Sequence, residues 1–329
     1  MSTFYADWLR RSEENDKAVN NSPVAARGAE LDWVETPQDA RTAVVIGAAS
    51  GFPTQGSVLL KSEIPVGWHT GSHVHGEEAV HILEGNGFVV VDGRRYDFRP
   101  GTTLHMPYMS EHQWVNTGTE PVTYLSAMSA DLDLFGRLGR FEQRSEKGEG
   151  NDALAASYPA EESQFAPDGR RIALHPEDRI DEYAARSKAG EHGHDGNGPA
   201  HRHGAIWILM GGGEGRSTET NGFVSKAAAM THIFEEVPHS SSHKHSHTEA
   251  MLYVLEGRGY SEVDGARYDW SAGDAVHIPP KMTMHEHFND SDSRTRTLRI
   301  EFGIRYFYES LWDGYTKVEH RLEAMARHG

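Results

Sequence analysis

Two stretches of the chain repeat each other: HILEGNGFVVVDGRRYDFRPGTTLHMP at 81–107 and YVLEGRGYSEVDGARYDWSAGDAVHIP at 253–279. Their offset is 172 residues (253 minus 81), and four glycines coincide: Gly85 with Gly257, Gly87 with Gly259, Gly93 with Gly265, and Gly101 with Gly273. This repeat is much longer than the period of a solenoid, so it indicates a duplicated domain.

The sequence of each copy predicts a series of short β-strands. Runs rich in Val, Ile, Tyr and Phe are separated by turn dipeptides. Asp92-Gly93 and Asp264-Gly265 predict hairpins, because a type I′ turn needs positive φ at both central residues and Asp-Gly tolerates this well. The predicted fold is all-β dominated, with two jelly-roll β-barrel domains and short flanking helices.

The repeats suggest domain boundaries. We expect an N-terminal extension over 1–39, barrels over 40–130 and 205–304, a linker rich in His and Gly over 131–204, and a helical tail over 305–329. Helical patterns lie only outside the repeats, at 2–12, 131–146, 178–189 and in the C-terminal segment.

Composition excludes several classes of protein. The net charge of −17 opposes binding to nucleic acid or to anionic membranes, and the absence of cysteine excludes disulfides and thiolate ligands. The chain has neither a long apolar run nor a signal-peptide pattern, so we expect a soluble, cytoplasmic protein.

Histidines and glycines at fixed spacing carry the strongest motifs. In the C-terminal copy, His243, His245 and Glu249 precede Gly257, and Pro279, His285 and Asn289 follow it. In the N-terminal copy the second half of this pattern consists of Gly101, Pro107, His112 and Asn116. Each copy resembles a cupin domain, and the chain resembles a bicupin over about residues 40–128 and 205–303.

The cupin resemblance implies a metal site in the C-terminal copy. Residues i and i+2 of a strand share one face, so His243 and His245 can both enter the barrel, with Glu249 at the same parity and His285 on a facing strand. An extra residue after Pro279 leaves His287 as an alternative to His285. Imidazoles with a carboxylate suit Fe(II), and Mn or Zn less distinctively.

The N-terminal copy departs from this pattern, because Gly71 stands where the other copy has His243. The candidate ligands of a second metal here are His73, His75, Glu77 or Glu78, and His112. The alternative is a barrel that has lost its metal and whose histidines form hydrogen bonds. Because its ligand set looks fuller, we give the C-terminal site priority. His192, His194, His201 and His203 lie in a Gly-rich stretch that we interpret as a solvated loop or a lid.

The pair of prolines followed by HEH in the second motif resembles the ring-cleaving dioxygenases of the gentisate and hydroquinone type, above all the large subunit of hydroquinone 1,2-dioxygenase. This resemblance implies an Fe(II) enzyme of aromatic degradation that acts on a small phenol and O₂. His247, His287 or Lys244 would take the phenolic proton.

Two alternatives belong to other classes. One is a lyase, decarboxylase or isomerase acting on a small polar acid, which a pocket with several arginines would favour. The other is a non-catalytic binding or storage bicupin. An arginine that holds a substrate carboxylate could not be placed, and Arg258, Arg267 and Arg299 are candidates only because they lie on predicted strands.

Assembly is a further expectation. The apolar segment at 304–315 should dock on the barrel or on a partner chain, and exposed sheet edges favour pairing, so we predict a homodimer. The hydroquinone resemblance also implies a separate small subunit.

Overall fold

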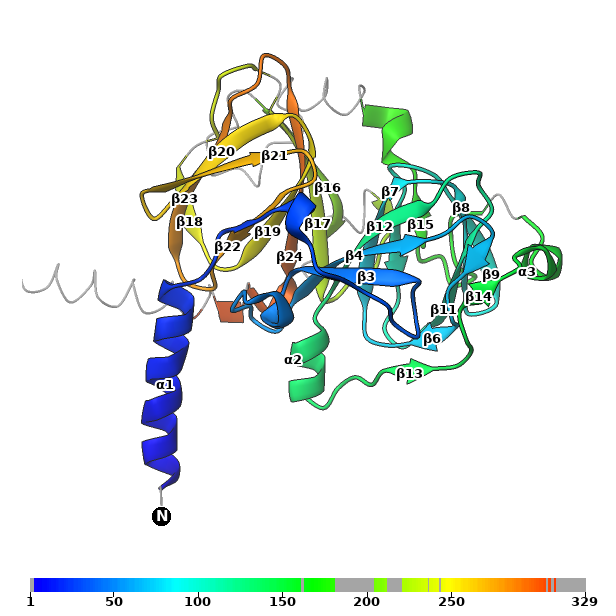
Figure 1. Cartoon of the computed structure of the whole chain (residues 1–329), viewed down its shortest axis with the longest axis horizontal. Helices are drawn as coiled ribbons and strands as arrows, with labels where there is room; N and C mark the ends of the chain where they lie inside the picture. The colour runs from blue at the N-terminus through cyan, green and yellow to red at the C-terminus, as the bar shows by residue number, and fades with distance from the viewer. Residues whose placement is uncertain are drawn as a thin grey trace, which may run out of the picture.

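The chain folds into two β-barrels that lie side by side (Figure 1). The computed structural model describes residues 3–160, 163–180, 204–211, 221–235, 237–242, 244–305, 307–308 and 311. The predicted all-β fold class is confirmed. Among the described residues, no helix is long and apolar enough to cross a membrane.

The N-terminal barrel is built from two antiparallel sheets. The first sheet has the order β15 (Ala173–Leu174), β10 (Thr103–Met106), β7 (Glu78–Glu84), β12 (Val122–Met128), β4 (Val58–Ile64), β3 (Arg41–Ile46) and β2 (Trp33–Val34). The second has the order β13 (Glu142–Gln143), β6 (His73–Val74), β11 (Glu111–Asn116), β5 (Trp68–His69) and β14 (Gly148–Glu149), with β8 (Gly87–Val91) paired to β11 and to β9 (Arg94–Phe98).

The C-terminal barrel repeats this plan. Its first sheet has the order β1 (Ala25–Ala26), β22 (Ala275–Ile278), β19 (Ala250–Glu256), β24 (Thr295–Phe302), β17 (Ala228–Glu235) and β16 (Gly204–Gly211). Its second has the order β18 (His245–His247), β23 (Thr283–Asn289), β20 (Arg258–Val263) and β21 (Ala266–Ser271).

Both predicted hairpin turns are present. Asp92 and Gly93 have φ of 48° and 79° between β8 and β9, and Asp264 and Gly265 have φ of 49° and 82° between β20 and β21. Positive φ at both central residues is the geometry of a type I′ turn. The duplicated sequence therefore gives duplicated hairpins.

Helices lie at the margins of the barrels, and their extents differ from the predicted ones. The described helices are α1 (Phe4–Asn20), α2 (Ala130–Phe135) and α3 (Asp152–Ser157), with 3-10 turns η1 (Gly28–Glu30), η2 (Ala48–Ser50) and η3 (Pro176–Arg179). The pattern at 131–146 gives only the short α2, which ends at Gly136 and is followed by Arg137 in the left-handed conformation, with φ of 56°. Most of the predicted helix at 178–189 and of the C-terminal tail lies outside the described residues.

Short strands are exchanged between the two barrels. β1 precedes the N-terminal barrel but pairs with β22 of the other barrel, with Ala26 opposite Ala275. β15 precedes the C-terminal barrel and pairs with β10 of the first, with Leu174 opposite Thr103. Each barrel therefore depends on a segment that leads into the other.

Between the barrels lies one shared apolar core. Strands alternate their side chains between two faces, and in β7, β12, β19 and β24 one face points into the barrel while the other points to the neighbour. The shared cluster includes Leu59, Leu125 and Ala127 of the first barrel together with Trp207, Phe234, Met251, Leu298 and Ile300 of the second. Separate clusters fill the two barrel interiors. The two barrels therefore form one packed body.

A core truncation tests this coupling. Leu125 is fully buried in the shared cluster, so Leu125→Ala should lower the free energy of unfolding by about 2–5 kcal/mol. In urea titrations, circular dichroism and tryptophan fluorescence should report a single shifted transition. Leu9, which is 52% exposed on α1, provides the control, and Leu9→Ala should change stability by less than about 0.5 kcal/mol. Two separate transitions, of which only one moves, would contradict a shared core.

Candidate functional site

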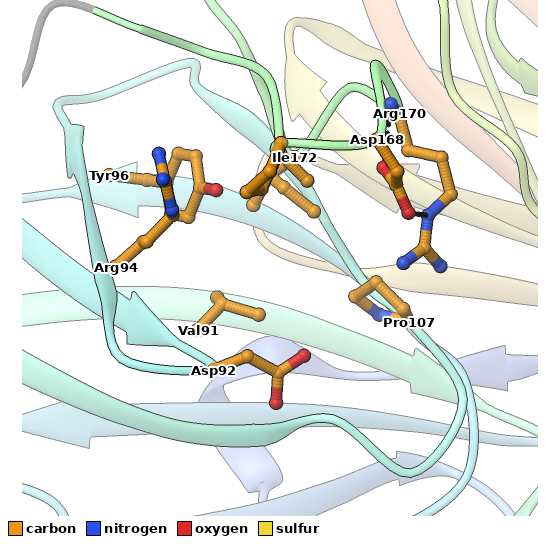
Figure 2. A pocket seen from close by; sticks show the side chains of 10 residues that line it. Val91, Asp92, Arg94, Tyr96, Pro107, Asp168, Arg170 and Ile172 are labelled. Atoms are coloured by element: carbon orange, nitrogen blue, oxygen red, sulfur yellow. Dashed lines mark hydrogen bonds and ion pairs between the residues drawn. The ribbon is translucent and has the colours of Figure 1, made fainter.

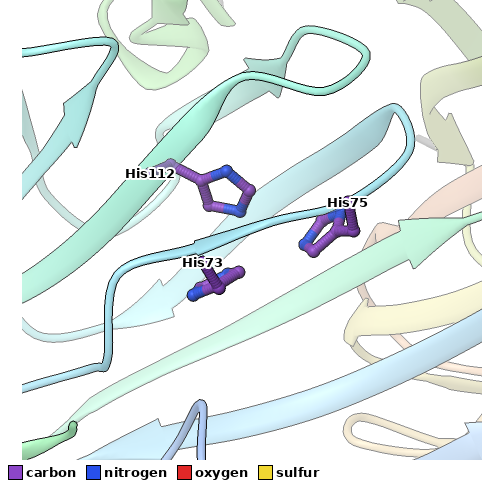
Figure 3. Close-up of side chains that lie close together, drawn as sticks. All are labelled: His73, His75 and His112. Atoms are coloured by element: carbon purple, nitrogen blue, oxygen red, sulfur yellow. The ribbon is translucent and has the colours of Figure 1, made fainter. Parts of the chain in front are cut away.

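Three histidines meet inside the N-terminal barrel. His73 comes from β6, His75 follows it one residue after that strand ends, and His112 comes from the antiparallel neighbour β11. One ring nitrogen of each lies within 4.8 Å of the others, and all three side chains are buried (Figure 3). His73 and His75, two residues apart, therefore reach the same cluster, as the alternation of side chains along a strand predicts.

Hydrogen bonds fix the orientation of each ring. The Nδ1 atoms of His73, His75 and His112 lie 2.7, 2.9 and 3.0 Å from the backbone oxygens of Gly71, Gly76 and Ser110. A backbone acceptor at Nδ1 places the ring proton there and leaves Nε2 with a lone pair. All three Nε2 atoms are buried and have no hydrogen-bond partner in the described part of the chain. This is the tautomer that a metal ligand requires.

Glu78 supplies a carboxylate to the same cluster. Its Oε2 lies 3.4 Å from Nε2 of His112 and 3.7 Å from Nε2 of His75, and the Ser126 hydroxyl donates to its Oε1. Burial alone would raise the pKa of Glu78, but His112, His75 and Ser126 lower it to about 2. The carboxylate is therefore ionised at neutral pH and faces the lone pairs.

Burial also disfavours protonation of two of these imidazoles. It lowers the pKa of His73 well below its usual range, with His112 and His75 adding to the effect, and it lowers the pKa of His75 in the same way. Neutral imidazoles and one ionised carboxylate are the protonation states that bind a divalent cation. A buried carboxylate oxygen and three buried lone pairs without hydrogen-bond partners fit such an ion, because a buried polar group otherwise costs free energy.

A second triad occupies the C-terminal barrel. His245 and His247 lie on β18 and His285 on β23, with one nitrogen of each within 4.8 Å of the others. Nδ1 of His247 and of His285 face the backbone oxygens of Thr248 and Thr283 at 2.6 and 2.8 Å, and their Nε2 atoms lie 3.1 Å apart. The two triads are thus built from equivalent strands in the same way.

The predicted C-terminal ligand set differs from this cluster. Glu249 is absent from it, since its carboxylate accepts hydrogen bonds from His277 Nε2 at 3.0 Å and from the Ser57 hydroxyl of the other barrel at 2.7 Å. Parity counting from His245 fails because Thr248 and Glu249 lie between β18 and β19, where strand alternation is interrupted. His243 lies outside the described residues.

In the C-terminal barrel an alanine takes the sequence position of Glu78. Glu78 is the first residue of β7, and the first residue of β19, 172 positions later, is Ala250. Among the described residues, which do not include His243, the N-terminal barrel therefore holds the fuller donor set, whereas from the sequence we gave priority to the C-terminal site. Counting seven residues back from Gly85 and from Gly257 to Glu78 and Ala250 would have revealed this difference.

Glu77 and Glu249 instead form a matched pair between the barrels. Glu77 accepts from His105 Nε2 at 2.7 Å and from the backbone amides of Lys226, Ala227 and Ala228 in the other barrel. Glu249 makes the reciprocal contacts, to His277 and to Ser57 and the amide of Gln55. The adjacent residues Glu77 and Glu78 thus point in opposite directions, one to the barrel interface and one to the histidines.

The predicted proton acceptors lie in the C-terminal barrel. His247 belongs to the triad, whereas His287 lies beside His285 with ring centroids 5.3 Å apart and its Nδ1 2.8 Å from the Ser261 hydroxyl. His285, and not His287, is the third histidine of the triad. It lies opposite His245, just as His112 lies opposite His73 in the other barrel. His192, His194, His201 and His203 lie outside the described residues.

A surface pocket lies apart from both triads. It has a volume of about 230 Å³ and is lined by Val91, Asp92, Arg94, Tyr96, Pro107, Ala166, Pro167, Asp168, Arg170 and Ile172 (Figure 2). Arg170 pairs with Asp168 at 2.6 Å. Because none of the clustered histidines lines it, this pocket is not the candidate site.

Comparison with known proteins agrees with the two-barrel fold. The sequence profile of a family described as a cupin domain matches residues 60–128 and 233–301. The chain therefore has the fold of a bicupin, with two regions in tandem that match the cupin domain. Its fold is the one found in bicupin ring-cleaving dioxygenases.

Two solved structures share the fold at low identity. Salicylate 1,2-dioxygenase from Pseudaminobacter salicylatoxidans superimposes with a TM-score of 0.60 at 15% identity, over 89% of this chain and 82% of the other. Oxalate decarboxylase from Bacillus subtilis gives 0.57 at 14% identity, over 85% and 76%. An uncharacterized protein of Methanocaldococcus jannaschii is 33% identical over 69 residues, and these cover 20% of this chain and 55% of that relative.

Removing a histidine tests the N-terminal centre. His73→Ala should lower the number of divalent ions bound per chain by one, because the loss of a ligand costs more affinity than the ~10–100-fold that loss of an outer-shell partner costs. The measurement is elemental analysis after loading with Fe(II) and desalting. His69 in the same barrel is a matched control, since its Nδ1 contacts the backbone oxygen of Thr70 and it lies outside the triad. An unchanged ion count in His73→Ala would exclude the N-terminal centre.

The adjacent glutamates provide a second test. Glu77→Ala removes one partner of a buried charged group at the barrel interface, so it should lower the free energy of unfolding by about 3–5 kcal/mol while metal is retained. Glu78→Ala should weaken metal binding and leave the metal-free fold closer to the wild type. Urea titration and metal analysis of the same two variants measure both effects. If Glu77→Ala lost metal and Glu78→Ala lost stability instead, the assigned directions of the two side chains would be contradicted.

Proposed function

We propose that the protein is an Fe(II)-dependent dioxygenase that opens the ring of a small phenol, with its metal held by His73, His75, His112 and Glu78. The carrying observation is that three buried histidine nitrogens converge and that Oε2 of Glu78 lies 3.4 and 3.7 Å from two of them, all without hydrogen-bond partners in the described part of the chain. Three imidazoles and a carboxylate suit iron, and they also suit Mn or Zn. When bound, iron would supply the redox chemistry that joins O₂ to an organic substrate.

The chain itself provides an aromatic neighbour at this centre. Phe141 lies between α2 and β13, is 50% exposed, and its ring centroid lies 5.4 Å from that of His75. A flat substrate can stack on such a ring while one of its oxygens faces the histidines. The dioxygenase fold supports this choice, and the salicylate 1,2-dioxygenase of that fold has been crystallised with gentisate.

A specific observation favours a second candidate, a decarboxylase or lyase acting on a small acid. Arg299 of β24 and Arg305 lie mostly buried near the C-terminal triad, with side chains 16% and 10% exposed. Of the three arginines considered from the sequence, Arg258 and Arg267 are exposed, and Arg299 is the one directed inward. The shared fold with oxalate decarboxylase is compatible with this candidate.

Substrate assays separate the candidates. After anaerobic loading with Fe(II), we expect O₂ uptake with hydroquinone, gentisate or catechol, and its loss in His112→Ala but not in His69→Ala. Release of CO₂ from oxalate without uptake on any phenol would instead support the second candidate. If neither reaction occurs and no divalent ion remains bound, the protein is a non-catalytic bicupin.

The remaining expectations stay proposals. Iron at the C-terminal triad with His243, proton transfer by His247 or His287, a homodimer and a separate small subunit all fit a bicupin dioxygenase. Sedimentation of the purified chain and a pull-down from the native host measure the last two.

A further inference from the structure

The first helix forms an arm that leaves the body of the protein. α1 contains no buried residue. Its base is anchored on the C-terminal barrel, where the Lys281 ammonium donates to Asn20 at 3.4 Å and the Ser22 hydroxyl lies 3.3 Å from Nδ1 of His277. From there the helix points away from both barrels (Figure 1). At the rise of an α-helix its 17 residues span roughly 25 Å, so its N-terminal end lies far from the barrels of its own chain.

Local interactions hold the arm in a helix. The Thr3 hydroxyl caps it by accepting a hydrogen bond from the Ala6 amide at 3.2 Å. Arg10 pairs with Asp7 at 2.6 Å and with Glu14 at 2.7 Å, one turn away on either side. Such contacts are individually weak, and helices in proteins gain most of their stability by packing an apolar face. We therefore looked for such a face on the arm and for a surface that fits it.

Three exposed aromatic side chains form the tip of the arm. Phe4 and Trp8, one turn apart, meet edge to face with their ring centroids 5.1 Å apart, and Tyr5 follows Phe4 on the helix. Phe4 is 71% exposed and Trp8 59%. Aromatic residues supply much of the binding energy at protein interfaces, so this aromatic tip indicates contact with another molecule.

The N-terminal barrel carries a second exposed apolar surface. It is the segment 134–141, here named the apolar loop, which runs from the end of α2 towards β13. Phe135 is 82% exposed, and Phe141 lies against His75 of the triad. A molecule that covers the apolar loop therefore also covers one side of the N-terminal triad. The exposed apolar residues of the loop are Leu134, Phe135, Leu138 and Phe141.

Charge favours contact between the arm and the apolar loop. Residues 134–144 contain three arginines and one glutamate, which give a net charge of +2. α1 contains four acidic and three basic residues, which give −1. Two copies of a chain with a net charge of −17 repel each other at long range, so they associate best where one of them offers a cationic surface.

We propose that two copies of the chain form a dimer in which the aromatic tip of each α1 packs on the apolar loop of the partner copy. Because α1 leads away from its own barrels, the surface that it covers belongs to the second copy. Two such reciprocal contacts bury roughly 1,500–2,000 Å², the size of a standard stable interface. Each N-terminal triad is then covered, on the side of Phe141, by a helix of the partner copy. The proposal does not depend on the reaction that the triad supports.

Crosslinking tests the contact directly, because the chain has no cysteine of its own. Ser12→Cys, one turn from Trp8, and Leu138→Cys are purified separately, mixed until subunits exchange, and treated with a short bismaleimide. We expect a covalent dimer in this mixture. Ser12→Cys mixed with Val66→Cys is the matched control, since Val66 is exposed and lies outside the apolar loop. Equal amounts of covalent dimer in the two mixtures would overturn the proposal.

Sedimentation velocity measures the same contact without a crosslinker. The wild type should sediment as a dimer, and Trp8→Ser should raise its dissociation constant about 30-fold or more, as the loss of an interface aromatic does. Since α1 has no buried residue, this variant should keep the circular dichroism of the wild type. Glu13→Gln, on another side of the same helix, should dimerise normally. A monomeric wild type, or a dimer that Trp8→Ser leaves equally tight, would overturn the proposal.

Discussion

Strand alternation is the constraint on which this structure depends. Each of β7, β12, β19 and β24 presents one face to its own barrel and the other to the neighbouring barrel. The inward faces line the barrel interiors, where Glu78 of β7 meets the histidines, and the outward faces build a common apolar core. At the start of β7 this alternation separates Glu77, which holds the barrels together, from Glu78, which faces the histidines. A shift of one residue would exchange these roles.

Duplication gave the protein two copies of one scaffold, and a few substitutions made their interiors different. Both copies keep three histidines whose rings are oriented by backbone oxygens. The carboxylate of Glu78 joins one set, whereas Ala250 takes the equivalent position in the other barrel. The reciprocal exchange of β1 and β15 and the matched contacts of Glu77 and Glu249 connect the two barrels into one body.

The sequence predicted the fold and most of the histidines because both follow local rules. Asp-Gly pairs specify hairpins, and an HxH pair on a strand must share a face. The carboxylate was harder to assign, since Glu249 lies in the turn between two strands, where parity no longer applies. The exchange of β1 and β15 could not be foreseen, because two-residue strands leave no periodic pattern. The placement of Arg299 opposite Leu252 depends on the register between strands far apart in sequence, which a single sequence does not reveal.

The central claim is that one divalent ion lies among the donors of the N-terminal barrel. An anomalous difference map from crystals of the Fe(II)-loaded protein, recorded on both sides of the iron absorption edge, tests it most directly. The account predicts a peak enclosed by Nε2 of His73, His75 and His112 and by the carboxylate of Glu78. A map with no peak at these atoms, or with its peak only at the triad of the C-terminal barrel, would contradict it.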